Sequence, residues 1–228
     1  MRNGAGMGDA VCVLLRVWLP DRPGALGAVA SRIGSVRGDI VGIDVLERNQ
    51  GIAIDEFGVI LPDADILPLL VREVEEVDGS RVEHVAVVNH FPDPRLDALV
   101  SVALVCEADT PAALQAALTT YAGCAFLADW VALLDGDGIV DSWGDPPGED
   151  QLAVLAKPDL DAPPGDAGDG GSGSLAVARL PDQSAVLLVG RTGQEFRARE
   201  LAQLVALTRI ADRVWSRLAE GARCRPHC

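Results

Sequence analysis

The order of apolar patterns between residues 11 and 90 constrains the fold more than any other feature of the sequence. Four segments have strand-like patterns rich in Val, Ile and Leu: 11–19, 40–47, 52–61 and 81–89. Two segments with apolar residues at helical spacing, beginning at Pro23 and near Asp65, follow the first and third strands. The order β-α-β-β-α-β predicts an α+β domain of ferredoxin-like fold, a four-stranded antiparallel sheet with two helices on one face.

A second domain is predicted over residues 97–220, beyond a boundary that Phe91-Pro92-Asp93-Pro94 indicates. We expect an antiparallel sheet of about five strands flanked by helices. The expected strands are 99–105, 130–134, 139–143, 175–180 and 185–189. The turn Asp135-Gly136-Asp137-Gly138 joins the second and third of these strands into a hairpin.

Helix-start signals complete the second half. Thr110 and Pro111 predict a helix that Gly123 ends, and Thr192-x-x-Glu195 has the form of a capping box before a long amphipathic helix, 196–218. Segments 1–10, 158–174 and 221–228 are expected to be mobile.

The net charge of −15 argues against unassisted nucleic-acid binding and against anionic membrane surfaces. Residues 191–228 are an exception to this excess of acidic residues, with 8 basic and 4 acidic side chains. This segment is either a solvated helix face or a contact surface. Five scattered cysteines form no disulfide framework, and no signal peptide or stretch of ~18 apolar residues is present. We therefore expect a soluble cytoplasmic protein, and the preference for Arg over Lys indicates GC-rich bacterial coding.

The segment from Leu14 to Leu26, which ends in Asp21-Arg22-Pro23-Gly24-Ala25-Leu26, resembles the opening of an ACT domain. Gly38-Asp39-Ile40-Val41-Gly42-Ile43 resembles that family's second strand, so the resemblance covers about residues 11–90. ACT domains bind amino acids or similar small effectors at a dimer interface and regulate attached domains.

The resemblance implies a ligand site formed by Asp21, Arg22, Pro23, Gly24, Ala25 and Leu26 together with Asp39, Ile40 and Val41 of a neighbouring domain. Gly24 allows close backbone approach, the following helix N-terminus suits a carboxylate, and Asp21 can accept from an ammonium group. Some members carry a polar amide where Ile40 and Val41 stand. That departure leaves room for an apolar ligand or for none.

The second half resembles a GAF domain over about residues 97–220. Ala128 to Leu134 with Gly138-Ile139-Val140 is similar to the family's central hairpin, and Leu187 to Arg191 with Glu195 to Leu201 to its last strand and closing helix. GAF domains bind small molecules or dimerise, and the resemblance identifies no ligand residue in this half of the sequence.

Other clusters favour structural interpretations. The Asp135 to Asp141 segment lacks the terminal acid of a calcium loop, and Asp169-Gly170-Gly171-Ser172-Gly173 lacks the Lys of a phosphate loop. Cys224-Arg225-Pro226-His227-Cys228 lacks an evident fourth metal ligand. His84 is expected in the sheet, and Cys106 and Cys124 are expected to be buried.

We expect no metal, no cofactor and no catalytic residues, and therefore a protein that is not an enzyme. Because a fold does not determine function, an enzyme of unrecognised type is kept as a third hypothesis after the following two. The leading hypothesis is a homodimeric or larger symmetric regulator that senses a small effector, an amino acid, and relays it to an unknown protein partner. The alternative is a protein-interaction or dimerisation module whose ACT and GAF folds have lost small-ligand binding.

Overall fold

The computed structural model describes residues 10–89, 91, 93–157 and 173–223. Most of the segments expected to be mobile lie outside the described residues, as do His227 with both tail cysteines and residues 169–172 of the glycine-rich loop. The chain divides into two compact units, Met1–Phe91 and Pro92–Cys228.

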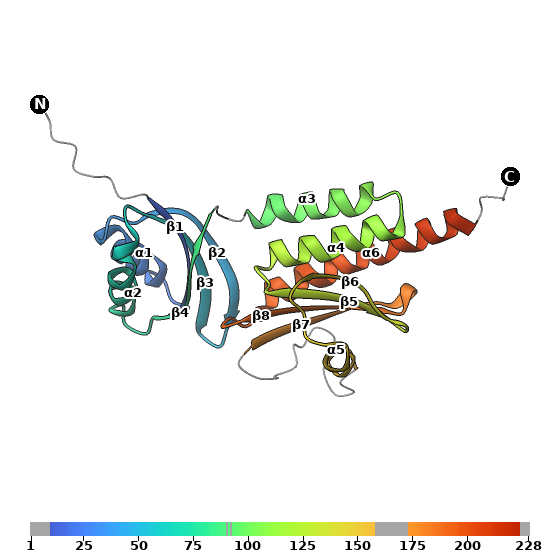
Figure 1. The fold of residues 1–228 in the computed structure, drawn as a ribbon. Helices are drawn as coiled ribbons and strands as arrows, with labels where there is room; N and C mark the ends of the chain where they lie inside the picture. Colours follow the sequence, from blue (N-terminus) through green and yellow to red (C-terminus); the bar gives the residue numbers. More distant parts are fainter. Residues whose placement is uncertain (1–9, 90, 92, 158–172, 224–228) are drawn as a thin grey trace, which may run out of the picture. The chain divides into compact units, whose positions relative to one another are not determined.

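The first unit has the predicted element order. Its elements are β1 (Val11–Pro20), α1 (Ala25–Ser35), β2 (Asp39–Asn49), β3 (Ile52–Leu61), the 3-10 turn η1 (Ala64–Ile66), α2 (Leu67–Glu75) and β4 (Arg81–Val88). All neighbouring strands are antiparallel and the sheet order is β2-β3-β1-β4. With α1 and α2 on one face (Figure 1), this confirms the ferredoxin-like α+β prediction.

Alternation along the central strands builds the core of this unit. Val13, Leu15 and Val17 of β1 pack with Phe57 and other residues of β3 against α1 and α2. The β2–β3 hairpin turns at Gln50 and Gly51, both with positive φ, as a tight two-residue hairpin turn requires.

The second unit is also a four-stranded antiparallel sheet, one strand fewer than expected. Its elements are α3 (Pro94–Glu107), α4 (Pro111–Ala125), β5 (Trp130–Asp135), β6 (Gly138–Gly144), α5 (Glu149–Leu155), β7 (Gly173–Leu180), the 3-10 turn η2 (Pro181–Gln183), β8 (Ala185–Thr192) and α6 (Ala198–Arg223). The strand order is β6-β5-β8-β7. Helices α3, α4 and α6 lie on one face and α5 on the other (Figure 1).

The segment predicted as a strand at 99–105 is instead part of helix α3. Asp93 caps this helix by accepting from the N–H groups of Arg95 and Leu96, and Pro94 occupies the first turn. The Ser101 hydroxyl donates to the Asp97 carbonyl one turn earlier. Start signals at the boundary thus outweigh the β-branched run that suggested a strand.

Several smaller expectations also need correction. The Thr110 cap is confirmed, but α4 continues past Gly123, where the indole of Trp143 covers the glycine. The capping box at Thr192 is wrong: α6 begins at Ala198, and the Glu200 carboxylate accepts from the Arg197 N–H. Residues 173–174 belong to β7 and 221–223 to α6, and Cys106 and Cys124 are exposed rather than buried.

Candidate functional site

The loop between β1 and α1 holds the six residues predicted to meet a ligand. The Asp21 N–H donates to the Gly51 carbonyl at 2.8 Å, which ties the loop to the β2–β3 turn. The first four residues of the loop are exposed, whereas Ala25 is buried and Leu26 is 39% exposed. The loop therefore offers polar and backbone groups to solvent from a defined position.

The N-terminus of α1 is open. Gly24 precedes the helix with φ 90°, a left-handed conformation that glycine adopts without strain, and no side chain within the described chain caps the helix. No acidic residue stands in the first turn, where the N–H groups of Leu26 and Gly27 have no acceptor inside the helix. Free N–H groups and the helix dipole make this end a site for a carboxylate.

The second predicted half of the site lies at the far end of the same sheet. Pro20 pairs with Ile52, beside the loop, whereas Asp39 pairs with Ile60. Ile60 is eight residue steps beyond Ile52 along β3, which at about 3.4 Å per step is roughly 27 Å. Asp39, Ile40 and Val41 of one chain therefore do not meet Asp21 to Leu26 of that chain, and a combined site requires a second copy.

Asp55 is a functional candidate that sequence reasoning missed. It stands on the helix-facing side of β3, opposite Val17, and is only 3% exposed. Among the described residues, no hydrogen-bond donor reaches its Oδ1 atom. The only sequence signal for Asp55 is that an acidic residue interrupts the apolar segment Ile52 to Leu61. The neighbouring Glu56 interrupts the same segment but pairs with Arg16 at 2.8 Å, so the sequence alone does not distinguish Asp55 from a paired carboxylate.

Burial raises the pKa of the Asp55 carboxyl above its ordinary value of 3.8. The Arg48 guanidinium opposes the rise and the Asp21 carboxylate adds to it, so both groups lie within electrostatic reach. Arg48 and Asp21 form a partly exposed ion pair at 3.9 Å. A cation brought to this place would offset the burial of Asp55 and lower its pKa.

These groups together suit a small zwitterion. The open first turn of α1 can receive a carboxylate. The unpartnered Oδ1 of Asp55 is shielded from solvent, so it can receive an ammonium group once the side chains that cover it move. In strand register Asp55 is three residues from Ile52, so it lies roughly 10 Å along the sheet from the start of the loop. That separation is larger than the distance between the α-carboxylate and the α-ammonium of one amino acid, which share a single Cα, so an ammonium that reaches Asp55 belongs to the effector's side chain.

The outer strand β2 exposes apolar side chains. Val41 is 48% exposed, Ile43 41% and Val45 36%, and β2 is an edge of the sheet. Long apolar edge strands are templates for pairing with another strand. Ile40 is only half-buried and packs on the core, so of the three predicted β2 residues Val41 is the apolar one most open to a partner.

The remaining clusters stay structural. Gly136 and Asp137 form the β5–β6 turn, in which the Asp137 N–H donates to the Asp135 carboxylate at 2.8 Å. His84 lies in the first sheet, opposite Arg16 in the register of β1 and β4. Among the described residues no group of three His, Cys, Asp or Glu side chains is arranged to hold a metal. Within the same residues no helix has the length and apolarity to span a membrane.

The fold class of the first unit is thus a ferredoxin-like α+β domain, and comparisons with known proteins add weak similarities. No family model and no curated protein matches the chain. One similar structure is the ACT domain of a GTP pyrophosphokinase from Chlorobium tepidum, 18% identical, covering 36% of this chain and 90% of that one with a TM-score of 0.28.

Two further structures illustrate the range of similarity. A formyltetrahydrofolate deformylase from Pseudomonas putida is 18% identical over 39% of this chain and 36% of that one, with a TM-score of 0.28. An unknown protein from Galdieria sulphuraria is 14% identical over 93% of this chain and 94% of that one, with a TM-score of 0.33. Similarities this weak decide neither family nor function, and the GAF assignment of the second unit stays a prediction.

Proposed function

We propose that this chain is a non-catalytic regulatory protein whose first unit binds a small zwitterionic effector, an amino acid. The observation that carries the proposal is Asp55, a buried carboxylate with an unpartnered oxygen, which lies roughly 10 Å in strand register from the start of the loop that precedes the uncapped N-terminus of α1. An unsatisfied buried polar group costs stability, and such costs are characteristic of functional sites. The resemblance of Asp21 to Leu26 to an ACT loop points to the same place.

A two-fold dimer through β2 would complete the site. If two β2 strands pair antiparallel about a two-fold axis, the start of one strand lies beside the end of the other. Asp39, Ile40 and Val41 of the second copy then approach the loop of the first, and the exposed Val41 and Ile43 become buried. The effector would thus be held between copies in a homodimer or a larger symmetric assembly.

The second unit is the proposed output. Its β5–β6 hairpin and its closing pair, β8 and α6, are the elements that the GAF resemblance implies. In this cytoplasmic regulator, effector binding would change the surface that the second unit offers to a protein partner. Such coupling requires the effector to bind two states with different affinities.

The test is a thermal-shift screen of the full chain against the common amino acids. An effector at about 100 times its dissociation constant adds about 2.7 kcal/mol of stability, a shift of several degrees. We expect one or a few related amino acids to stabilise the wild type and to lose this effect in Gly24→Asp, whose carboxylate competes for the α1 N-terminus.

Gly193→Asp is the matched control, because Gly193 also has a positive φ of 78° and open space for a side chain, but lies in the second unit. It should keep the response. A panel without any shift, or a shift that survives Gly24→Asp, would refute effector binding at this loop.

The exposed apolar edge of β2 also favours the second candidate, an interaction module that binds no small ligand. In that case a chain with Ile43→Lys would lose self-association or capture of its partner, while the amino-acid panel stays flat in every variant. The two candidates therefore predict different responses to the amino-acid panel but the same loss of association when the β2 edge carries Ile43→Lys.

A further inference from the structure

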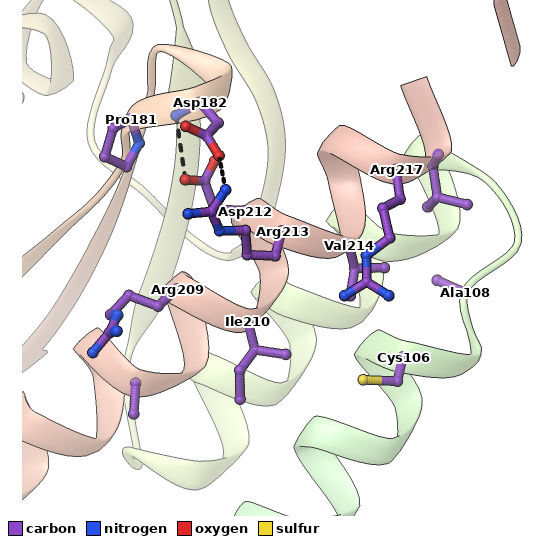
Figure 2. Close-up of a pocket in the computed structure, with 12 residues that line it drawn as sticks. Cys106, Ala108, Pro181, Asp182, Arg209, Ile210, Asp212, Arg213, Val214 and Arg217 are labelled. Carbon is purple, nitrogen blue, oxygen red and sulfur yellow. Dashed lines mark hydrogen bonds and ion pairs between the residues drawn. The ribbon is translucent and has the colours of Figure 1, made fainter. Parts of the chain in front are cut away.

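A groove of about 850 Å³ lies within the second unit, apart from the amino-acid site proposed above. One wall is the outer face of α6, and the others are the C-terminal end of α3 with Ala108 and the turn η2 (Figure 2). The volume falls within the ~300–1,000 Å³ typical of small-molecule sites.

Three arginines of α6 line this groove at a spacing of four residues. Arg209, Arg213 and Arg217 follow one face of the helix, and the outer two are roughly 12 Å apart along its axis (Figure 2). Arg213 pairs with Asp182 at 3.1 Å. Within the described chain Arg209 and Arg217 have no hydrogen-bond or ion-pair partner, so both guanidinium groups remain available to a ligand.

A buried carboxylate lies among these cations. Asp212 is 6% exposed and lines the groove, and its Oδ2 accepts from the Asp182 N–H at 3.2 Å. No donor among the described residues reaches its Oδ1. The groove therefore offers unpaired donors for anionic oxygens. The solvent-shielded Oδ1 of Asp212 is an unsatisfied acceptor that a hydroxyl or amino group reaches once the side chains that cover it move.

We propose that this groove binds a nucleoside polyphosphate. A phosphate chain offers several anionic oxygens to arginines spread over roughly 12 Å, and Arg is suited to bidentate phosphate contacts. The ribose hydroxyl or base amino group donates to Asp212 Oδ1, and the base packs on the aliphatic side chains of Ile210 and Val214. In a chain with a net charge of −15, this cationic face opposes the general repulsion of anions.

A small organic polyphosphate fits better than an acidic protein segment. The carboxylates of a peptide could pair with Arg209 and Arg217, but they leave Asp212 without a donor and add negative charge close to it. A nucleoside polyphosphate places its negative charge at one end and its hydrogen-bond donors at the other. Its nucleoside end can therefore donate to Asp212 while its phosphate end pairs with an arginine, whereas a peptide carboxylate has no such donor.

The experiment is calorimetric titration of the full chain with ATP, GTP and tripolyphosphate in magnesium-free buffer at low salt. We expect saturable binding, with at least one nucleotide tighter than tripolyphosphate because only nucleotides satisfy Asp212. The double variant Arg209→Gln/Arg217→Gln should weaken binding by about tenfold or more, since each lost charge-assisted contact is strong. Both side chains are exposed and unpaired among the described residues, so the variant should fold normally.

Two further variants separate a specific site from general attraction of anions. Arg95→Gln removes an exposed arginine of the same unit outside the groove and should leave binding unchanged. Asp212→Asn should abolish the preference for nucleotide over tripolyphosphate, because the amide oxygen is held by the Asp182 N–H and the NH₂ group faces the ligand.

Three outcomes would overturn the proposal: no binding of either nucleotide by the wild type, equal loss in Arg95→Gln and the double variant, or tripolyphosphate that binds as tightly as both nucleotides. These outcomes leave the amino-acid panel untouched, so they are separate from a failure of the proposed function.

Discussion

Replacement of Asp55 by Asn should stabilise the free protein at neutral pH while abolishing effector binding. The carboxylate is 3% exposed and its Oδ1 has no donor among the described residues, so its ionised form is held at a cost. Leaving a buried polar group unsatisfied costs about 1–3 kcal/mol, and more for a charge. Asn has nearly the same shape without the charge, so we expect a gain of at least about 1 kcal/mol at pH 7.

The sign of the pH dependence follows from the raised pKa of Asp55. The folded state binds the proton more tightly than the unfolded state, so stability falls as the pH rises from the ordinary value of 3.8 through the folded-state pKa. The difference between Asp55→Asn and wild type should therefore be small near pH 4 and reach its full size above the folded-state pKa. Each unit of pKa shift corresponds to about 1.4 kcal/mol.

Differential scanning calorimetry between pH 4 and pH 8 measures this difference. A gain of 1 kcal/mol raises the melting temperature of a domain of this size by about 4–8 °C. Asp65→Asn, the same substitution at an exposed position of the first unit, is the matched control and should change little. A destabilised Asp55→Asn protein at pH 7, or a gain that is equal at both ends of the pH range, would show that the ionised Asp55 does not destabilise the folded state.

Three further predictions test the packing and the edge strand. Ala at Gly190 would overlap the indole of Trp130 and should destabilise the second unit by about 1–3 kcal/mol in urea unfolding. Arg191→Met leaves the carboxylate of Glu200, paired at 2.7 Å, without this cation and should cost about 3–5 kcal/mol by the same assay. Ile43→Lys should shift the sedimentation coefficient from dimer to monomer without lowering the melting temperature.

Each of these has its own control. Gly136→Ala fills open space at an exposed turn and should be nearly neutral. Arg191→Met with Glu200→Gln should recover part of the loss, because the buried charge is removed together with its partner. Lys at Leu69, an apolar residue of α2 that is 38% exposed, should leave sedimentation unchanged; monomers in every variant and in the wild type would contradict the dimer.

The first unit is predictable because its local signals agree. Apolar periodicity, the Pro23 helix start and the Gln50-Gly51 turn each specify the same topology. Strand boundaries at Pro20 and Leu61 follow from loop residues that come directly after them. The loop from Asp21 to Leu26, which we propose binds the effector, is likewise visible, because the Gly24 conformation is a local property.

Asp55 is less visible because its burial is a tertiary property. An acidic residue in a strand is normally exposed, and only the pairing of β3 with β1 places Asp55 beside Val17 on the face that α1 and α2 cover. The groove on α6 is hidden for the same reason. Its arginines are evenly spaced in the sequence, but η2 and the end of α3 are what enclose them.

Helix α3 shows how local signals can compete. Leu99, Val100 and Val102 to Val105 favour a strand by composition, yet the segment follows the Asp93 cap and Pro94. Only Val105 of this stretch joins the buried core, so its apolar residues do not alternate between a buried and an exposed face as those of a strand would. A cap immediately before a segment is the better guide where periodicity is weak.

An amide NMR titration of the full chain with a mixture of the common amino acids tests effector binding at the loop directly. We expect the Leu26 and Gly27 amide resonances to shift in a saturable way, because these N–H groups receive the effector carboxylate, and we expect Asp55→Asn to remove the shift. Resonances of this loop that stay unmoved, or shifts that persist in Asp55→Asn, would contradict effector binding at this site.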